Sequence, residues 1–370
     1  MFKNSTRSAI ASLEARWFMA VMATGALAIF SQILGVAAGS LMLKFLALIF
    51  LGVAGGVFVL AIFGFLARAV ICPSCVKKDF LHPVSSKFFA GISIASAILS
   101  TAISKIVIPE KLISLDFAVQ LATSLYWFGI VFGVIVIFSV CAMLICSEKV
   151  EQKHAIGIWL LPPVGLFVNI FAGNFLVPHW SVSFSEKVLI FHLFLIGVAF
   201  VIFAVVQMMI FFRMKFQPLP PASVAPSFFI PLAPVGVSLI AFFSLAAATG
   251  SIESLAHFSG AIKNFLVLYT PFILGFGFFW FGITLILFFS KYLKRGTSIP
   301  FSLGFFAFVF PTAALGISLA TVSLAVPVFG FLIFVAKFFW VLSVGLWGIT
   351  IVHVFRGIFS GTIFQRPDGL

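Results

Sequence analysis

Long apolar stretches alternate with short polar connections along the whole chain. About 20 apolar residues are enough for a helix to cross the hydrocarbon core of a bilayer, and ten stretches reach that length. The predicted spans cover residues 17–35, 39–70, 88–107, 117–146, 156–177, 184–214, 224–250, 262–293, 298–324 and 327–358. Barrel strands would be shorter and would alternate in hydropathy. The pattern therefore predicts an all-α integral membrane protein, with residues 1–370 forming a single transmembrane domain.

The ten spans fall into pairs. The odd-numbered spans begin near residues 17, 88, 156, 224 and 298, a repeat of about 70 residues, and a fixed period indicates repeated supersecondary units. The even-numbered spans run to about 30 residues, which implies tilt or extension beyond the bilayer. We expect five helical hairpins in a quasi-fivefold arrangement around a central pore.

Proline positions distinguish the two sets of spans. The even spans contain only Pro271 and Pro327, both near predicted helix starts, where proline is tolerated. A proline inside a spanning helix frees a carbonyl that only protein or water can satisfy, although such a kink can also serve packing alone. We expect the odd helices to surround the pore and the even helices to face lipid. The candidate pore-lining and kink positions are Gly25, Gly91, Pro162, Pro163, Pro231, Pro234 and Pro311.

Composition and charge exclude a soluble protein. Hydrophobic residues make up 63% of the chain and charged residues 8%, against about 25% charged residues in soluble domains. The connections are too short for a catalytic or nucleic-acid-binding domain, so neither an enzyme nor a nucleic-acid partner is expected. Sixteen of the 22 Lys and Arg residues fall on one side of the predicted spans. The positive-inside rule makes that side cytoplasmic, with both termini there, and we expect a cell (inner) membrane location.

Apart from Glu186, the third residue of the span 184–214, acidic side chains are missing from the predicted spans. Intramembrane carboxylates are the usual relays of proton and cation transporters, and cation channels favour acidic rings. A pathway lined by the odd helices would instead be apolar with a few neutral dipoles, which suits anions that interact with helix dipoles and backbone N–H groups. The candidate polar groups of the pore are Thr24, Ser93, Asn169, Ser238 and Thr312.

Other chemistry has little support. Cys72 and Cys75 have C-x-x-C spacing and His82 follows, but three ligands without a strand–helix context favour a pair of reduced thiols over a metal or redox site. We expect no metal and no cofactor. The chain contains no Walker A motif, which disfavours ATP-driven transport.

Five segments resemble the tellurite-resistance/dicarboxylate transporter family, whose members include bacterial TehA, the yeast malic acid transport protein and the plant guard-cell slow anion channel. The segments are Arg16-Trp17-Phe18 followed by MAVMATGALAIF, Asp79-Phe80-Leu81-His82-Pro83-Val84 followed by Phe88-Phe89, His154 followed by AIGIWLLPPVGL, PLAPVGVS at 231–238, and FFAFVFPTAALG at 305–316. They fall on all five odd spans in the same order, so the resemblance covers nearly the full chain.

The resemblance implies a homotrimer in which each protomer holds its own pore, lined by five inner helices and blocked midway by a phenylalanine. Alignment of the aromatic-Phe-Pro segment makes that gate Phe310. FVFP stands where plant channels tend to have a hydroxylated residue before the phenylalanine, so conductance and selectivity are expected to differ.

The first interpretation is a passive channel or facilitator for small anions, with C4-dicarboxylates among the candidates. A proton-linked dicarboxylate carrier is the alternative and would require a titrating group, for which His192 or His154 is available. Efflux of tellurite or other toxicants is a third interpretation, and a structural membrane protein a fourth. In each case membrane lipid is an expected partner.

Overall fold

The computed structural model describes residues 13–148, 150–293 and 299–361. Ten helical spans cross the described part of the chain, and no strand occurs there. They run over Ala15–Ala38, Leu41–Ile71, Ser85–Val107, Leu115–Cys146, Gly157–His179, Val182–Phe216, Ala222–Gly250, Glu253–Tyr292, Leu303–Ala325 and Leu332–Phe359. The prediction of ten spans is confirmed. The largest boundary difference is at the eighth span, which begins at 253 rather than 262, and the predicted start of the ninth, at 298, lies outside the described residues.

The odd-numbered spans form the interior of the bundle. Their α-helices are α2 (Phe18–Ala38), α5 (Ala90–Ala102), α7 (Leu161–Leu176), α9 (Leu232–Gly250) and α11 (Phe306–Ala325). Each contacts the next in this order, and α11 contacts α2, so the contacts close into a ring. Between 89% and 94% of the residues in their most apolar windows are buried.

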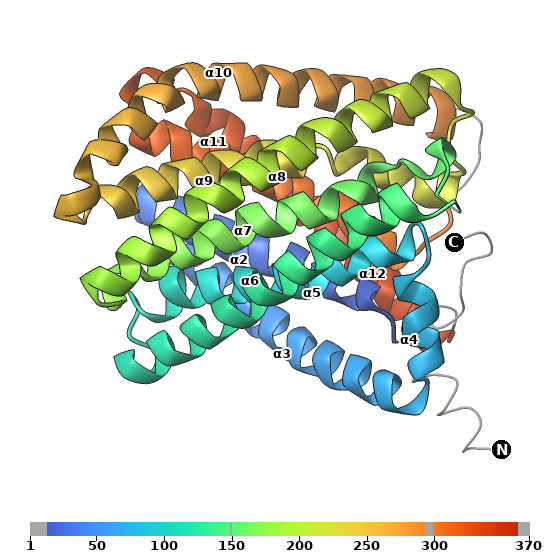
Figure 1. Cartoon of the computed structure of the whole chain (residues 1–370), viewed down its shortest axis with the longest axis horizontal. Helices are drawn as coiled ribbons and strands as arrows, with labels where there is room; N and C mark the ends of the chain where they lie inside the picture. The colour runs from blue at the N-terminus through green and yellow to red at the C-terminus, as the bar shows by residue number, and fades with distance from the viewer. Residues whose placement is uncertain (1–12, 149, 294–298, 362–370) are drawn as a thin grey trace.

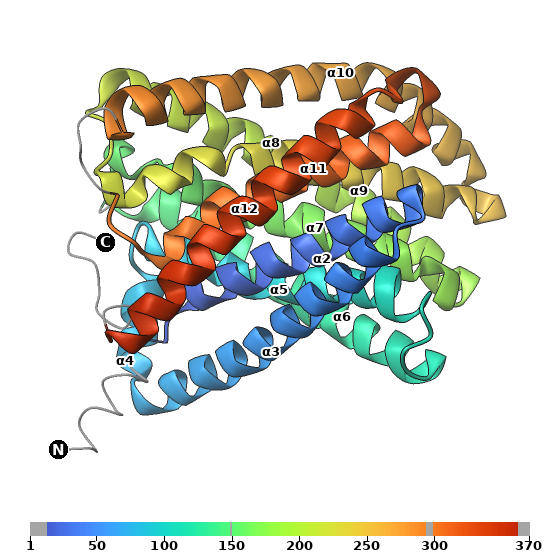
Figure 2. The same ribbon diagram turned by 180° about the vertical axis from the view of Figure 1, so that it is seen from behind.

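The even-numbered spans cover this ring. They are α3 (Leu41–Ile71), α6 (Leu115–Cys146), α8 (Val182–Phe216), α10 (Ala256–Leu287) and α12 (Leu332–Phe359). Each packs against the inner helix that precedes it in the chain. Figure 1 shows α8 in front of α7 and α9, and Figure 2, from behind, shows α12 in front of α11. Only 17–39% of their apolar windows are buried, and exposed phenylalanines such as Phe63, Phe194 and Phe272 form a surface suited to lipid.

Every inner span begins with a short 3₁₀ segment. These segments are η1 (Ala15–Trp17), η2 (Ser85–Phe89), η5 (Gly157–Leu160), η7 (Ala222–Phe229) and η10 (Leu303–Phe305). All five lie at the same end of the bundle, because each inner span runs in the same direction. We call it the basic end, since ten described cations belong to it: Arg16, Arg68, Lys77, Lys78, Lys87, Lys153, Arg213, Lys215, Lys291 and Arg356.

The opposite end of the bundle is called the distal end. It carries six cations: Lys44, Lys105, Lys111, Lys187, Lys263 and Lys337. Six cations counted in the charge asymmetry, Lys3, Arg7, Lys149, Lys294, Arg295 and Arg366, lie outside the described residues. The asymmetry that predicts topology therefore persists among the described side chains.

The prolines differ in place from the sequence-based expectation. Pro162 and Pro163 lie in the first turn of α7, and Pro231 immediately precedes α9, with Pro234 in its first turn. A proline in the first turn costs no intrahelical hydrogen bond, because the N–H groups of that turn have no intrahelical acceptor. These four mark the junction of a 3₁₀ segment with an α-helix, rather than an interior kink. Among the inner α-helices, Pro311 alone is inside, in α11.

The expectation for one outer proline is wrong. Pro271 lies in the middle of α10 rather than near a helix start. The predicted start of this span, residue 262, comes later in the chain than the observed start, Glu253. Pro271 therefore lies close to the predicted start but far from the observed one. Pro327, by contrast, lies in the short segment η11 (Pro327–Phe329), ahead of α12.

Candidate functional site: the central cavity

A cavity of about 380 Å³ lies inside the ring of inner helices. All five inner spans contribute to its wall, which is mainly apolar. It extends to Leu324, whose side chain is 57% exposed near the end of α11, so the cavity reaches the distal end of the bundle. The lining residues include Ala26 and Ile29 of α2, Ile98 of α5, Phe171 of α7, Val237 of α9, and Phe310 and Ala314 of α11.

Phe310 is the predicted site residue that lines this cavity, and it is 3% exposed. Ala307, three residues earlier on α11, lines a separate, smaller hollow at the basic end. One turn of α11 therefore separates the two spaces, and Phe310 lies on the turn between them.

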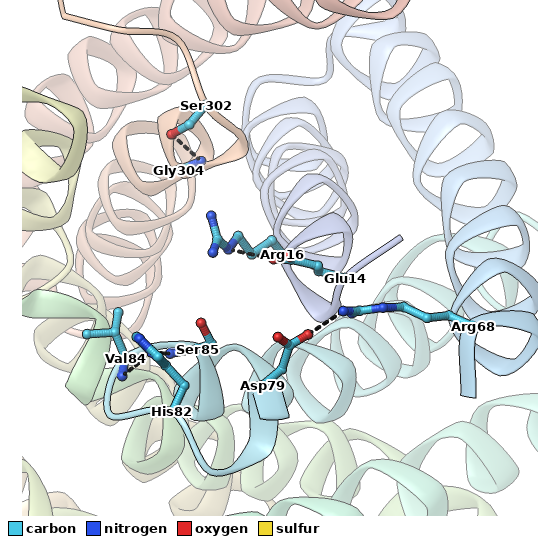
Figure 3. Close-up of polar contacts among 9 residues, drawn as sticks. All are labelled: Glu14, Arg16, Arg68, Asp79, His82, Val84, Ser85, Ser302 and Gly304. Carbon is cyan, nitrogen blue, oxygen red and sulfur yellow. Dashed lines mark hydrogen bonds and ion pairs between the residues drawn. The ribbon is translucent and has the colours of Figure 1, made fainter. Parts of the chain in front are cut away.

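The basic-end hollow is assembled from all five inner spans. Its lining includes Arg16, Phe88, Ile158, Ser227 and Ser302, each in or next to a 3₁₀ segment. The Nε atom of Arg16 lies 3.0 Å from Oε2 of Glu14, and its guanidinium carbon lies 5.2 Å from the centre of the Phe88 ring. Figure 3 shows the guanidinium directed into the space between the segment that carries His82 and the one that carries Ser302.

Lys105 brings a second cation to the axis, on the distal side. It belongs to η3 (Ile103–Val107), the π-helical end of the third span, and is the ionisable residue among those that line the central cavity. Its Nζ atom lies 3.7 Å from the centre of the Phe175 ring. The cavity wall thus contains a cation, whereas the sequence suggested neutral polar groups for the pore.

The five predicted polar groups of the pore do not line the cavity; they form hydrogen bonds to neighbouring helices. Trp347 donates to Thr24, and Ser93 donates to the Gly129 carbonyl. Ser238 is bonded to Tyr269. Similar bonds link Asn169 to Ser93 and Ser343 to Thr312, at 2.8 and 3.0 Å. Because lipid offers no partner to a buried hydroxyl or amide, these groups bond to neighbouring helices, whereas Oδ1 of Asn169 has no hydrogen-bond partner among the described residues.

The two predicted glycines also lie away from the cavity wall. A Cβ atom on Gly25 would approach Cγ2 of Ile98 to 2.5 Å, so this glycine lets α2 and α5 come close together. A Cβ on Gly91 would meet Phe18 at an ordinary 3.5 Å. Neither residue is part of the cavity lining, and the same holds for all five predicted prolines.

His192 is fully buried between helices. Its Nε2 atom lies 2.8 Å from the Tyr126 hydroxyl, and its Nδ1 atom lies 2.8 Å from Oδ1 of Asn174. Asn174 in turn donates to the hydroxyl of Ser244, which lines the central cavity. A chain of hydrogen bonds thus runs from α6 through α8 and α7 to α9.

Near the basic end, Cys72 and Cys75 are joined in a disulfide, so the expectation of reduced thiols is wrong for this structure. The helix that they begin, α4 (Pro73–Phe80), ends beside His82. Within the described residues, no group of three or more His, Cys, Asp and Glu side chains could hold a metal ion.

Two histidines at the basic end have altered acidity. Burial, together with the positive charges of His154 and Arg16, lowers the pKa of His82. Burial and Lys153 likewise lower the pKa of His154. In both residues Nδ1 accepts a backbone N–H, from Val84 and Ser85 or from Glu151, which requires that nitrogen to be deprotonated.

Arg16 and Lys105 are site residues that sequence reasoning missed. Among the sequence-based expectations, Arg16 occurs only in a segment that resembles the family, and Lys105 is not among the predicted pore residues. A signal was available for Lys105: Ile98, Thr101 and Lys105 have i, i+3, i+7 spacing, which puts them on one helix face. All three line the cavity.

Ten apolar spans around an internal cavity define a multi-pass membrane protein of the channel or transporter class. A family model described as voltage-dependent anion channel matches residues 12–355. The chain belongs to this family, which confirms the resemblance of the five odd-span segments.

Two relatives come from Methanocaldococcus jannaschii. The uncharacterized transporter MJ0762 is 26% identical over 369 residues, covering 97% of this chain and 98% of the relative. The uncharacterized transporter MJ0576 is 26% identical over 368 residues, covering 94% of each. The similarity thus extends over almost the entire length of all three chains. Proteins of this family are channels and transporters of small anions, not enzymes.

Proposed function

We propose that the chain is a passive channel or facilitator for small anions and that Phe310 closes its pathway. The observation that supports this most directly is the separation of two spaces on one axis: Ala307 lines the basic-end hollow, and Phe310 lines the central cavity one turn later. Both spaces are formed by all five inner spans. A side chain that swings out of the intervening layer would join them.

The proposed gate acts by volume and by dewetting. A phenyl ring in an apolar constriction excludes water, and an ion passing it would lose hydration without receiving a replacement. When the ring moves aside, an anion passes along the five inner helices and the electrochemical gradient supplies the drive. The proposed kink at Pro311, directly after Phe310, frees a backbone group beside the gate.

The proposed assembly follows from the family resemblance and the charge distribution. The inner helices are taken to have quasi-fivefold symmetry about the pore, and the protein to form a homotrimer in which each protomer conducts. The basic end is taken to face the cytoplasm of a cell (inner) membrane, by the positive-inside rule. Exposed apolar side chains on α3, α8 and α10 support contact with membrane lipid.

Small inorganic anions and C4-dicarboxylates are the proposed substrates. The cavity volume of about 380 Å³ falls within the range of roughly 300–1,000 Å³ common for small-molecule sites, so it accommodates either. Cations are disfavoured, because the cavity lining contains Lys105 and no acidic residue.

One observation favours the proton-linked carrier as a second candidate. The hydrogen-bond chain from His192 through Asn174 to Ser244 connects a histidine to the cavity wall. His192 itself lies outside the cavity lining and is bonded at both ring nitrogens. It would therefore have to exchange its proton through Asn174 or Tyr126. For tellurite or toxicant efflux we find no specific supporting contact in the described residues.

Reconstitution in planar bilayers with ion substitution tests the proposal. A channel gives unitary currents whose reversal potential follows the anion gradient and does not depend on a pH gradient. A carrier gives slow, saturable flux coupled to pH. If flux is coupled to pH and is lost in His192→Phe, the carrier replaces the channel as the assigned function.

A further inference from the structure

We propose that Lys105 is an anion-binding and specificity-determining residue on the distal side of Phe310. The proposal rests on the proposed channel function and adds the group that holds the anion. Its ligand is a single monovalent anionic group, with chloride as the probe.

The position of Lys105 in the cavity is the first argument. Ile98 and Lys105 share a face of the third span and both line the cavity. Seven residues at 1.5 Å each place Lys105 about 10 Å farther toward the distal end than Ile98. An anion that enters from this end therefore reaches Lys105 before it reaches the apolar layer around Phe310.

The charge of Lys105 is not neutralised by an acid. No carboxylate in the described part of the chain lies within 4.0 Å of its ammonium group. The acid nearest in sequence, Glu110, is bonded instead to Lys44 at 3.0 Å and to Gln32 at 3.2 Å. The ammonium group of Lys105 makes a cation–π contact with the ring of Phe175. This interaction is weak, and an anion can replace or extend it.

The other polar groups of the wall cannot serve as donors to the anion as they stand. The hydroxyls of Thr101 and Thr321 donate to carbonyls one turn earlier in their own helices, and Ser244 donates to the Ala241 carbonyl. An ammonium group carries three N–H donors, so Lys105 is left as the donor that can face a bound anion. In a mainly apolar cavity, its charge is also screened less than it would be in water.

The test uses variants in the Phe310→Ala background, where the pathway is open on the proposed account. Lys105→Gln removes the charge, and Lys105→Arg retains it. Lys337→Gln is a matched control: Lys337 also belongs to the distal end and lies 5.6 Å from a phenylalanine ring, Phe334, but it is not part of the cavity wall. Insertion is oriented by labelling a cysteine introduced at Ser114.

Chloride currents are measured at low ionic strength from each side. Lys105→Gln is expected to lower chloride entry from the distal end by roughly 2–10-fold, and less at high salt, because a fixed charge raises the local anion concentration. Entry from the basic end should fall less. The ratio of chloride to potassium permeability should also fall, and Lys105→Arg should restore both. A residue that only packs would change expression or thermal stability without producing this asymmetry.

Two results would overturn the inference in distinguishable ways. If the open Phe310→Ala protein conducts chloride and Lys105→Gln behaves like Lys337→Gln, Lys105 binds no anion and the channel proposal stands. If the Phe310→Ala protein passes no anion current in any variant, the proposed function fails and the role of Lys105 fails with it.

Discussion

Arg68 and Asp79 form a buried ion pair that ties the end of α3 to α4, with Nη2 and Oδ2 2.6 Å apart (Figure 3). Their side chains are 1% and 8% exposed. Because a buried charge without its partner is strongly unfavourable, this pair fixes the segment that leads from the second span to the third. The same segment carries His82, shortly after α4.

The pair predicts a large loss of stability when one partner is removed. Arg68→Ala or Asp79→Ala should each destabilise the fold by about 3–5 kcal/mol, whereas removing both should cost less than the sum of the two. Thermal unfolding in detergent measures this. The exposed Lys153–Glu151 pair is the control, and its loss should change stability by at most about 1 kcal/mol. Equal, small effects at both pairs would contradict the prediction.

The histidines at the basic end predict a pH dependence of stability. The folded pKa values of His82 and His154 lie below the ordinary value of 6.5, so the unfolded chain binds protons first as the pH falls. The free energy of unfolding should be highest above pH 6.5 and should fall as the pH is lowered from 6.5 to the folded pKa values. Thermal midpoints measured between pH 8 and pH 5 test this. A double His82→Gln, His154→Gln variant should lose part of the decline, and exposed His257→Gln should retain it.

The hydrogen bonds of Ser93 to two neighbouring helices predict a structural effect without a transport effect. The Ser93 hydroxyl accepts a hydrogen bond from Asn169 and donates one to the Gly129 carbonyl, and both bonds are buried. Ser93→Ala removes the two bonds together. It should lower stability by about 1–3 kcal/mol and leave anion selectivity unchanged. If Ser93→Ala instead alters the reversal potential at normal stability, the residue contacts the ion after all.

The close approach of α9 and α11 predicts a steric effect at Gly236. A Cβ there would meet the backbone of Ala314, a cavity-lining residue, at 2.4 Å. Since backbone cannot move aside, Gly236→Ala should destabilise the protein by about 1–3 kcal/mol. Gly345→Ala in α12, where a Cβ would meet nothing within 4 Å, should be neutral. Comparable thermal midpoints for the two variants would show that the helices can separate at no cost.

The spans could be predicted from sequence because lipid imposes a simple requirement. A helix must be long and apolar enough to cross the bilayer, so hydropathy located all ten. The difference in burial between inner and outer sets was also foreseen, although for a partly mistaken reason. Pro162, Pro163, Pro231 and Pro234 do mark the inner spans, but as first-turn residues at the 3₁₀ junctions.

The cavity lining was harder to predict, because a polar residue on an inner helix can face either the cavity or a neighbouring helix that offers a hydrogen-bond partner. Thr24, Ser238 and their counterparts face a neighbouring helix, where a partner is available. Sequence alone does not say which face of an almost uniformly apolar helix points inward. Lys105, by contrast, has an i, i+7 relation to Ile98, which places both residues on one face of the third span.

Phe310 is the residue on which the proposed gating depends most. It lines the central cavity, one turn after Ala307 of the basic-end hollow, whereas Phe308 packs against Phe229, Phe288 and Phe305 on the other side of the helix. Truncating a packed phenylalanine costs roughly 3–5 kcal/mol, and Phe308→Ala should therefore lower stability without opening a pathway.

The most direct measurement is the chloride conductance of Phe310→Ala in planar bilayers, with wild type and Phe308→Ala beside it. Removing a barrier of only about 1.4 kcal/mol raises a rate tenfold, so conductance should rise at least about tenfold in Phe310→Ala while the protein remains folded. Wild type and Phe308→Ala should stay near the closed level. A folded Phe310→Ala protein whose chloride conductance equals that of wild type would contradict the central claim.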